Sequence, residues 1–176
     1  MKIEYRDLCI RNAEARDCEQ LAAWWNDGAV MDHAGFPLGL GTTAAVVRGE
    51  IADDSDDTRR RLIIELAGAP IGEMSYSNLG GGTAELGIKI CDFTKQERGL
   101  GRAALSMLIS ALFARGYTRI ILDTNLKNLR AQHVYELLGF KKLRINKDSW
   151  TNQLGELQSS VDYELTPENF VNYAKD

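Results

Sequence analysis

The chain has 176 residues, the length of one ordinary domain, so we expect residues 1–176 to form a single domain. Its composition, 44% hydrophobic and 26% charged, is typical of a globular protein. The net charge of −4 argues against a nucleic-acid partner, because neutralising phosphates requires a basic surface. We expect no membrane partner either, since no apolar run approaches the roughly 20 residues of a membrane span.

Cysteine and histidine usage excludes two further classes. Cys9, Cys18 and Cys91 are an odd number without CxxC spacing, which argues against a disulfide framework and a zinc site. His33 and His133 are the only histidines and lie far apart in sequence, so no metal site is expected. Reduced thiols predict a cytoplasmic protein.

The N-terminal third of the chain predicts one strand followed by two helices. Leu8–Ala13 has the pattern of a short strand, and Asp17–Asp27 that of a helix. A second helix is predicted within Gly41–Asp54, with Thr42 or Thr43 as its N-cap.

The middle of the chain predicts an antiparallel meander. The polar run Ala52–Arg60 is interpreted as a solvated surface loop without a functional role. Three strand patterns follow, RLIIELAG, APIGEMSYSNLG and TAELGIKI, separated by the turn residues Ala67–Pro70 and Gly80–Gly82.

In the last part of the chain, the spacing of the apolar residues changes from that of strands to that of a helix. Apolar residues repeat at intervals of three and four from Leu100 and predict an amphipathic helix that ends at Gly116. A buried-type strand, Thr118–Asn125, precedes a helix with Asn128 as N-cap and Gly139 as its stop. KKLRINKDSW and LGELQSSVDYEL predict a closing pair of strands, so the fold class is a mixed α/β sheet.

Gly99 and Gly101 open the amphipathic helix and suggest an anion site. The first turn of a helix has unpaired N–H groups and partial positive charge, so a diphosphate is the natural ligand. A tight turn that packs the helix on a strand would need the same glycines. A P-loop is excluded, because Arg102 and Ala103 stand where lysine and serine or threonine are required.

A dinucleotide site is the second reading of this loop. GLGRAA fits GxGxxA, and Asp123 ends the next strand where a ribose-binding acid would lie. Against it, the polar run Asp92–Arg98 separates the preceding strand from the first glycine, and that strand belongs to a predicted meander.

Two motifs decide between these readings. Gln96-x-x-Gly99-x-Gly101 follows a strand and resembles the acetyl-CoA loop of the GNAT N-acetyltransferase superfamily. One strand later, a second stretch resembles the GNAT signature N-x-x-A-x-x-x-Y-x-x-x-G-F; its residues here are Asn128, Ala131, Tyr135, Gly139 and Phe140. LAAWWNDGAVMDHAGF and SWTNQLGELQSSVDYEL are similar to the Rim-type subgroup of ribosomal-protein alanine acetyltransferases and to some aminoglycoside acetyltransferases.

The resemblance implies a fold and a cosubstrate. We expect a mostly antiparallel mixed sheet of about six to seven strands flanked by about four helices. Acetyl-CoA would lay its diphosphate on the N–H groups of residues 98–103 and its pantetheine arm along residues 89–91, while the strand at residues 120–125 splays away. The implied coenzyme contacts are Lys89, Ile90, Cys91, Gln96, Arg98, Gly99, Leu100, Gly101, Arg102, Ala103 and Asn128.

Some of these residues have simpler interpretations. Arg102 could be a solvated charge, and Asn128 could cap its helix with or without touching the coenzyme. The resemblance implies Tyr135 as the acid that protonates the leaving thiolate, although its apolar helix face would also suit a core residue.

Two acidic residues are candidates for the general base that deprotonates the amine. Glu85 is the first choice, against a cross-strand salt bridge. Asp123 is the second choice, against a strand-end hydrogen-bonding residue. Cys91 has no paired histidine in view, so direct attack of the amine in a ternary complex is expected rather than a covalent intermediate.

The acceptor pocket of similar proteins is shaped by the helix–loop region near the start and by the last strands. Its implied residues here are Trp25, Asn26, Asp32, His33, Phe36 and Trp150. We expect one of the adjacent tryptophans, Trp24 or Trp25, to anchor a helix to the sheet instead. A small amine or a protein N-terminus is the expected partner, and a homodimer stays open. A coenzyme A sensor without catalysis and a dinucleotide-binding module remain the alternatives.

Overall fold

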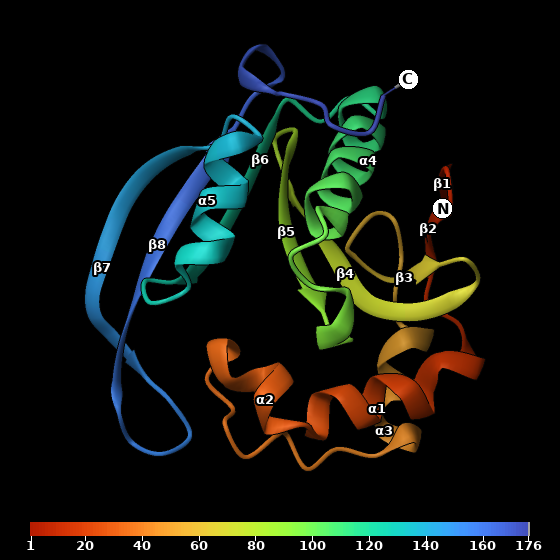
Figure 1. Cartoon of the computed structure of the whole chain (residues 1–176), viewed down its shortest axis with the longest axis vertical. Coiled ribbons are helices and arrows are strands. Elements are labelled where there is room, and N and C mark those ends of the chain that lie inside the picture. The colour runs from red at the N-terminus through yellow and green to blue at the C-terminus, as the bar shows by residue number, and fades with distance from the viewer. Residues whose placement is uncertain (176) are drawn as a thin grey trace.

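One eight-stranded sheet runs through residues 1–175, which this computed structural model describes (Figure 1). The strand order is β1-β2-β3-β4-β5-β6-β8-β7, and neighbouring strands are antiparallel except for β5 and β6. The strands are β1 Lys2–Tyr5, β2 Leu8–Asn12, β3 Arg59–Leu66, β4 Ala69–Gly80, β5 Thr83–Ile90, β6 Arg119–Asn125, β7 Lys141–Thr151 and β8 Leu157–Leu165.

Five α-helices accompany the sheet within the described residues. They are α1 Cys18–Asn26, α2 Gly28–Met31, α3 Ala44–Ala52, α4 Leu100–Ala114 and α5 Leu129–Leu137. Short 3-10 turns flank them, among them η1 Ala15–Asp17, η2 Asp32–Ala34 and η3 Phe93–Lys95. The expected mixed, mostly antiparallel α/β fold is therefore confirmed, with one more strand and one more helix than expected.

The two additions have local causes. β1 pairs with β2 from Lys2–Arg11 to Tyr5–Leu8, and this pairing makes a strand of a short and partly exposed segment. Helix α2 starts immediately after α1 because the Asp27 side chain accepts a hydrogen bond from the Ala29 N–H at 2.8 Å. Asp27 thus ends one helix and caps the next, where the sequence indicated only a stop.

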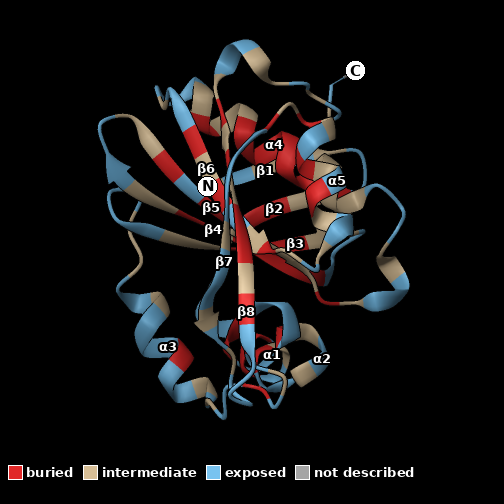
Figure 2. Cartoon of the chain, turned by 90° about the vertical axis from the view of Figure 1, so that its left-hand side faces the viewer, coloured by how far each residue is buried: buried red, intermediate tan, exposed pale blue. Residues whose placement is uncertain are grey.

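Two hydrophobic cores lie on opposite faces of the sheet. The larger packs α4 and α5 on the strands, and Leu105, Leu108 and Leu112 of α4 are buried in it. The smaller packs α1 and α3 on Ile63 of β3. Figure 2 shows buried residues along α4 and the middle strands, whereas α3 and much of β7 are exposed.

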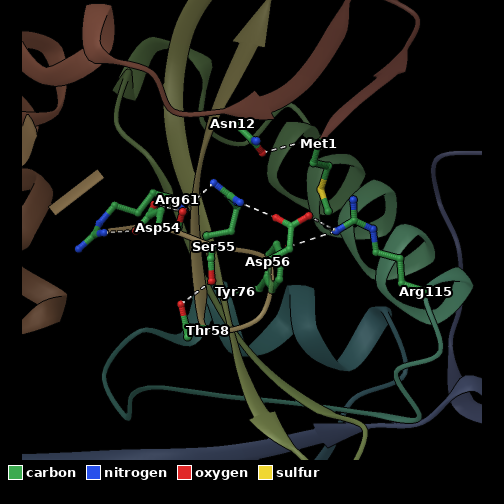
Figure 3. A network of polar contacts seen from close by, with 10 residues as sticks. Met1, Asn12, Asp54, Ser55, Asp56, Thr58, Arg61, Tyr76 and Arg115 are labelled. Carbon is green, nitrogen blue, oxygen red and sulfur yellow. Dashed lines mark hydrogen bonds and ion pairs between the residues drawn. The ribbon is translucent and has the colours of Figure 1, made fainter. Parts of the chain in front are cut away.

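The acidic loop before β3 is held by ion pairs rather than being only solvated. Asp56 accepts from Arg60 Nε at 2.7 Å and from Arg115 Nη1 at 3.2 Å (Figure 3). Arg115 Nη1 also donates to the hydroxyl of buried Tyr76 at 3.1 Å. The acids meet arginines that the sequence places in other elements, so the loop is tied to β3 and to the end of α4.

The sheet opens between β5 and β6, as expected. These strands pair in parallel only from Thr83–Arg119 to Glu85–Ile121. Beyond that point β5 stays paired with β4 and β6 with β8. Figure 1 shows β5 and β6 meeting at one end and separating toward α2. This separation places the candidate site.

Within the described part of the chain, no helix combines the length and the apolar character needed to cross a membrane.

Candidate active site

A cleft of about 930 Å³ lies where β5 and β6 part. Its walls come from both strands, the Gly99 loop, α5, the α2–η2 region and β7. Of the residues expected at the site, the cleft is lined by His33, Lys89, Ile90, Gln96, Gly99, Leu100, Gly101, Arg102, Asn128, Tyr135 and Trp150. Other expected residues lie outside this lining: Trp25, Asn26, Asp32, Phe36, Glu85, Cys91, Arg98 and Ala103.

The Gly99 loop presents free backbone donors to the cleft. Gly99 caps α4 with φ +75°, a conformation that a residue with a side chain rarely adopts, and Glu97 is also left-handed at φ +60°. The first helical bond runs from Ala103 N–H to Gly99 C=O at 3.0 Å. The preceding N–H groups of the first turn therefore have no intrahelical partner and form an anion-binding end.

Gln96 fixes this loop to the strand before it. Its Nε2 donates to the Ile90 carbonyl at 2.9 Å, and its Oε1 accepts from Arg130 Nη1 at 2.5 Å. The Gln96 amide thus links the end of β5 to α5 across the mouth of the cleft. Its role in this geometry is to shape the loop.

At the end of β5, some residues line the cleft and others bond to the neighbouring part of the sheet. Lys89 and Ile90 line the cleft. The Cys91 N–H donates to the Ile71 carbonyl at 2.9 Å, so it is used within the sheet and not offered to a coenzyme. Burial raises the pKa of the Cys91 thiol and keeps it protonated, so it is a poor nucleophile.

Asn128 both caps α5 and lies at the cleft, the two positions that the sequence left open. Its Oδ1 accepts from the Ala131 N–H at 3.2 Å and caps α5, and the residue also lines the cleft. Asn128 is thus positioned by its capping bond at the wall of the cleft.

Tyr135 projects from α5 as a buried residue that still lines the cleft. Its ring packs against Phe140 and Tyr163, with centroids 5.8 and 5.7 Å away. Burial, with a smaller contribution from the negative charge of Asp123, raises the pKa of Tyr135 above its ordinary value. The phenol therefore stays protonated at neutral pH. The core packing and a cleft-facing position coexist in this residue.

The two candidate bases are placed differently. Asp123 lines the cleft from β6, and burial together with the charge of Asp162 raises its pKa above the ordinary value of 3.8. Asp162 lies opposite it on β8. Glu85 is exposed and lies in the stretch where β5 and β6 are still paired, away from the cleft lining.

A buried carboxylate shows which of the two adjacent tryptophans anchors a helix to the sheet. Trp25 Nε1 donates to both Glu73 carboxylate oxygens, at 2.9 and 3.0 Å, so Trp25 anchors α1 to β4 as expected of one tryptophan. Lys89 Nζ donates to the same Glu73 at 3.2 Å. Asn26 is engaged with the Thr42 backbone through its amide group.

These residues border a second, smaller hollow of about 300 Å³ on the α1 side of the sheet. Trp25 and Glu73 line it, and Lys89 is shared with the larger cleft. Strand β5 therefore borders both hollows.

The far wall of the cleft joins two segments distant in sequence. His33 and Trp150 both line it. A Cβ on Gly35, whose φ is +95°, would lie 2.4 Å from the Trp150 ring, so only glycine allows this approach. Gln153 completes the junction: its N–H donates to Gly35 C=O at 2.8 Å, and its Oε1 accepts from Leu38 N–H at 2.9 Å.

Three residues near the site escaped the sequence analysis. Glu73, Arg130 and Asp162 lie beside Trp25, Gln96 and Asp123 respectively. The register of the β4–β5 hairpin, which pairs Glu73 with Lys89, carries a usable signal. The other two depend on contacts between elements that no local pattern encodes.

Solved structures share this fold across nearly the whole chain. A ribosomal L7/L12 alpha-N-protein acetyltransferase in complex with coenzyme A has a TM-score of 0.83 at 16% identity, covering 94% of this chain and 98% of that one. Spermidine N-acetyltransferase from Vibrio cholerae, in complex with coenzyme A and spermine, has a TM-score of 0.82 at 20% identity, covering 95% and 99%. A probable acetyltransferase has a TM-score of 0.81 at 22% identity, covering 97% and 99%.

At these identities the structures show a shared fold. A sequence search of curated proteins finds no significant match. The family model for the acetyltransferase (GNAT) domain matches residues 7–141, which is most of the chain and includes both the Gly99 loop and Tyr135. The chain therefore belongs to the GNAT acetyltransferase family and is an acetyl-CoA-dependent N-acetyltransferase.

Proposed function

We propose that the chain transfers the acetyl group of acetyl-CoA to a primary amine by direct attack in a ternary complex, within one domain spanning residues 1–176. The observation that carries the proposal is the parting of β5 and β6 beside the Gly99 loop, with Tyr135 and Asp123 in the same cleft. Three free cysteines support a cytoplasmic location.

Two features of the cleft support a position for the coenzyme. The free N–H groups at the start of α4 would receive the diphosphate. The edge of β5 beyond Glu85 no longer pairs with β6, so its backbone is available to the pantetheine arm. Lys89 and Ile90 lie on this free part, and the thioester would lie deeper in the cleft near Tyr135.

Tyr135 is assigned the acid role. Attack of the amine nitrogen on the thioester carbonyl forms a tetrahedral intermediate, and its collapse breaks the carbon–sulfur bond. The departing thiolate then takes the phenol proton. The phenol is protonated at neutral pH, as a general acid must be.

Asp123 is assigned the base role in preference to Glu85. It lines the cleft, whereas Glu85 does not. Its raised pKa makes its carboxylate, when ionised, a better proton acceptor than that of an ordinary aspartate. It would take the proton that the attacking amine must lose.

The acceptor is proposed to be a small cationic amine or a protein N-terminus. Trp150 and His33 form one wall of the cleft, and aromatic faces attract ammonium groups. Asp32 and Phe36 lie close to His33 in the sequence and are exposed, so we assign them to the rim of this wall. The relatives described above include a ribosomal-protein N-terminal acetyltransferase, as in the Rim-type subgroup, and a spermidine acetyltransferase, so both acceptor classes are worth testing.

The test is an acceptor panel. The protein is incubated with acetyl-CoA and spermidine, an alanine-initiated peptide or an aminoglycoside, and free thiol release and product mass are followed. We expect one acceptor class to gain 42 Da, the mass of an acetyl group replacing a proton, with initial-rate lines that intersect rather than run parallel.

Two results would overturn the proposal. Parallel lines together with an acetylated enzyme would replace direct attack by a covalent intermediate. Tight acetyl-CoA binding without acetylation of any amine would favour the sensor alternative.

A further inference from the structure

The chain segment after β8 returns to the helices that carry the site. Val171 N–H donates to Leu138 C=O at 3.0 Å, at the end of α5. Asn172 Nδ2 donates to Ser110 Oγ at 3.0 Å, on α4. We call residues 171–174 the return segment. Figure 1 shows the return segment beside α4.

The return segment is hydrogen-bonded to one face of α4. Tyr173 N–H donates to Ser106 Oγ at 3.0 Å, and Ser106 is fully buried. Arg102, Ser106 and Ser110 follow each other at intervals of four, so they share one face of the helix. The two serines hold the return segment and bring the Tyr173 ring to Arg102.

The Tyr173 ring holds the Arg102 guanidinium. The guanidinium carbon lies 4.2 Å from the ring centroid, within the range of a cation–π contact. A cation–π contact is not a hydrogen bond, and the guanidinium carries five N–H donors. No carboxylate within residues 1–175 pairs with Arg102, so these donors are available to a ligand.

Arg102 is held at the Gly99 turn. Its Nη2 lies 3.8 Å from the position that a Cβ on Gly99 would take, and Arg102 lines the cleft. A phosphate oxygen that approached the first turn of α4 would therefore meet backbone N–H groups and a guanidinium together. The sequence left open whether Arg102 is a solvated charge, and the ring contact argues against a freely solvated side chain.

We propose that Tyr173 is a positioning residue for the coenzyme. Its ring holds Arg102 beside the Gly99 turn, so that the guanidinium is already placed when a phosphate group of coenzyme A arrives. An unrestrained arginine would lose rotamer freedom on binding, and the ring contact removes part of that loss beforehand. This inference rests on the proposed position of the coenzyme diphosphate.

A purely structural role would look different. If Tyr173 only fastened the return segment to α4, its loss would lower stability without a preference for phosphorylated ligands. The test therefore compares coenzyme A with pantetheine, which lacks every phosphate group. Tyr173→Leu removes the ring and keeps apolar bulk, while Tyr173→Phe keeps the ring and serves as the matched control.

The experiment is a double-mutant cycle with Arg102→Ala, measured by calorimetric titration of each ligand. We expect Tyr173→Leu to raise the Kd for coenzyme A by about 2- to 5-fold, the range of an exposed cation–π contact. Tyr173→Phe should match the parent, and pantetheine should bind all variants alike. In the Arg102→Ala background, Tyr173→Leu should have no further effect.

The inference fails if Tyr173→Leu binds coenzyme A like the parent, if pantetheine loses affinity equally, or if the effects of the two substitutions are additive. Gly101→Leu, which fills the mouth of the cleft, separates this failure from that of the proposed function. Loss of coenzyme binding in Gly101→Leu with none in Tyr173→Leu would overturn only the role of Tyr173. Unchanged binding in Gly101→Leu would overturn the coenzyme position itself.

Discussion

Tyr135 shows how one residue can serve packing and chemistry together. Its ring is part of the main core, beside Phe140 and Tyr163, yet its side chain reaches the cleft. From its helical spacing alone it is indistinguishable from a core residue. Only the position of the cleft against α5 separates the two readings.

Removal of the hydroxyl tests the acid role. We expect Tyr135→Phe to lower kcat by roughly 10²-fold, the lower end for loss of a general acid. The ring contacts persist in this variant, so the Kd for coenzyme A should stay within about 2-fold of the parent. Steady-state rates and calorimetry measure the two quantities. An unchanged kcat would make Tyr135 a core residue without a catalytic role.

The pH profile tests the base. Burial and the charge of Asp162 raise the pKa of Asp123, and a base works only when deprotonated, so activity should be lost as pH falls through that raised pKa. We expect Asp123→Asn to lower kcat/KM by roughly 10²-fold and to abolish this acid limb.

Glu85→Gln is the matched control for that experiment. It removes a carboxylate one strand away, outside the cleft lining, and should keep the parental profile. If instead Glu85→Gln lost the acid limb and Asp123→Asn kept it, Glu85 would be the base.

At the level of elements, α1 is joined to the sheet by a buried ion pair. Arg11 on β2 donates to both Asp17 carboxylate oxygens, at 2.7 and 2.8 Å, and its Nε donates to Glu65 on β3 at 2.8 Å. Burial acts to raise the pKa of Asp17, but the hydrogen bonds from Arg11 and from the Glu14 N–H outweigh it and lower that pKa. The acceptor side of the site depends on this junction.

Loss of that pair should destabilise the fold. Asp17→Ala leaves the buried Arg11 guanidinium with one carboxylate, Glu65, and the Asn12 carbonyl, so we expect the free energy of unfolding to fall by about 3 kcal/mol. Arg16→Ala breaks an exposed pair with Glu14 and should change it little. Denaturant titration compares both variants with the parent, and equal midpoints for all three would contradict the account.

The same pair predicts a pH dependence of stability. Because the folded pKa of Asp17 is lowered, its contribution is present above the ordinary value of 3.8 and is lost as pH falls through the folded pKa. The difference in the free energy of unfolding between the parent and Asp17→Ala should therefore become smaller in that acid range. A gap that widened on acidification would reverse the assigned sign.

Local patterns predicted most elements, and contacts between elements account for what they missed. The β3–β4–β5 meander and α4 follow from alternation, turn residues and helical spacing. Strand β1 escaped because its segment is short and becomes a strand only by pairing with β2.

Local patterns likewise predicted the parts of the candidate site that do not depend on contacts between elements. Alternation places Glu85 on one face with Lys89, but no local signal tells where β6 leaves β5. That point, just after Glu85, decides which acid lines the cleft. The buried partner Glu73 was missed for a similar reason, since it is defined by Trp25 and Lys89 from other elements.

For the whole molecule, two cores on opposite faces hold one sheet, in which β5 and β6 pair at one end and separate at the other. The larger core fixes α4 and α5 on either side of the opening, and the smaller core brings α1 and α2 to its end. The cleft is thus a consequence of the topology, and the Gly99 loop lies at its mouth.

The most direct test of this account is calorimetric titration of coenzyme A into the parent and Gly101→Leu. A Cβ at Gly101 would lie 3.6 Å from Ile90 Cγ1, an ordinary contact, so Gly101→Ala is the control for the backbone. We predict one site per chain in the parent, little change in Gly101→Ala and at least about 10-fold weaker binding in Gly101→Leu, or about 1.4 kcal/mol. Equal affinity in all three proteins would contradict a coenzyme bound between β5 and β6 at the Gly99 loop.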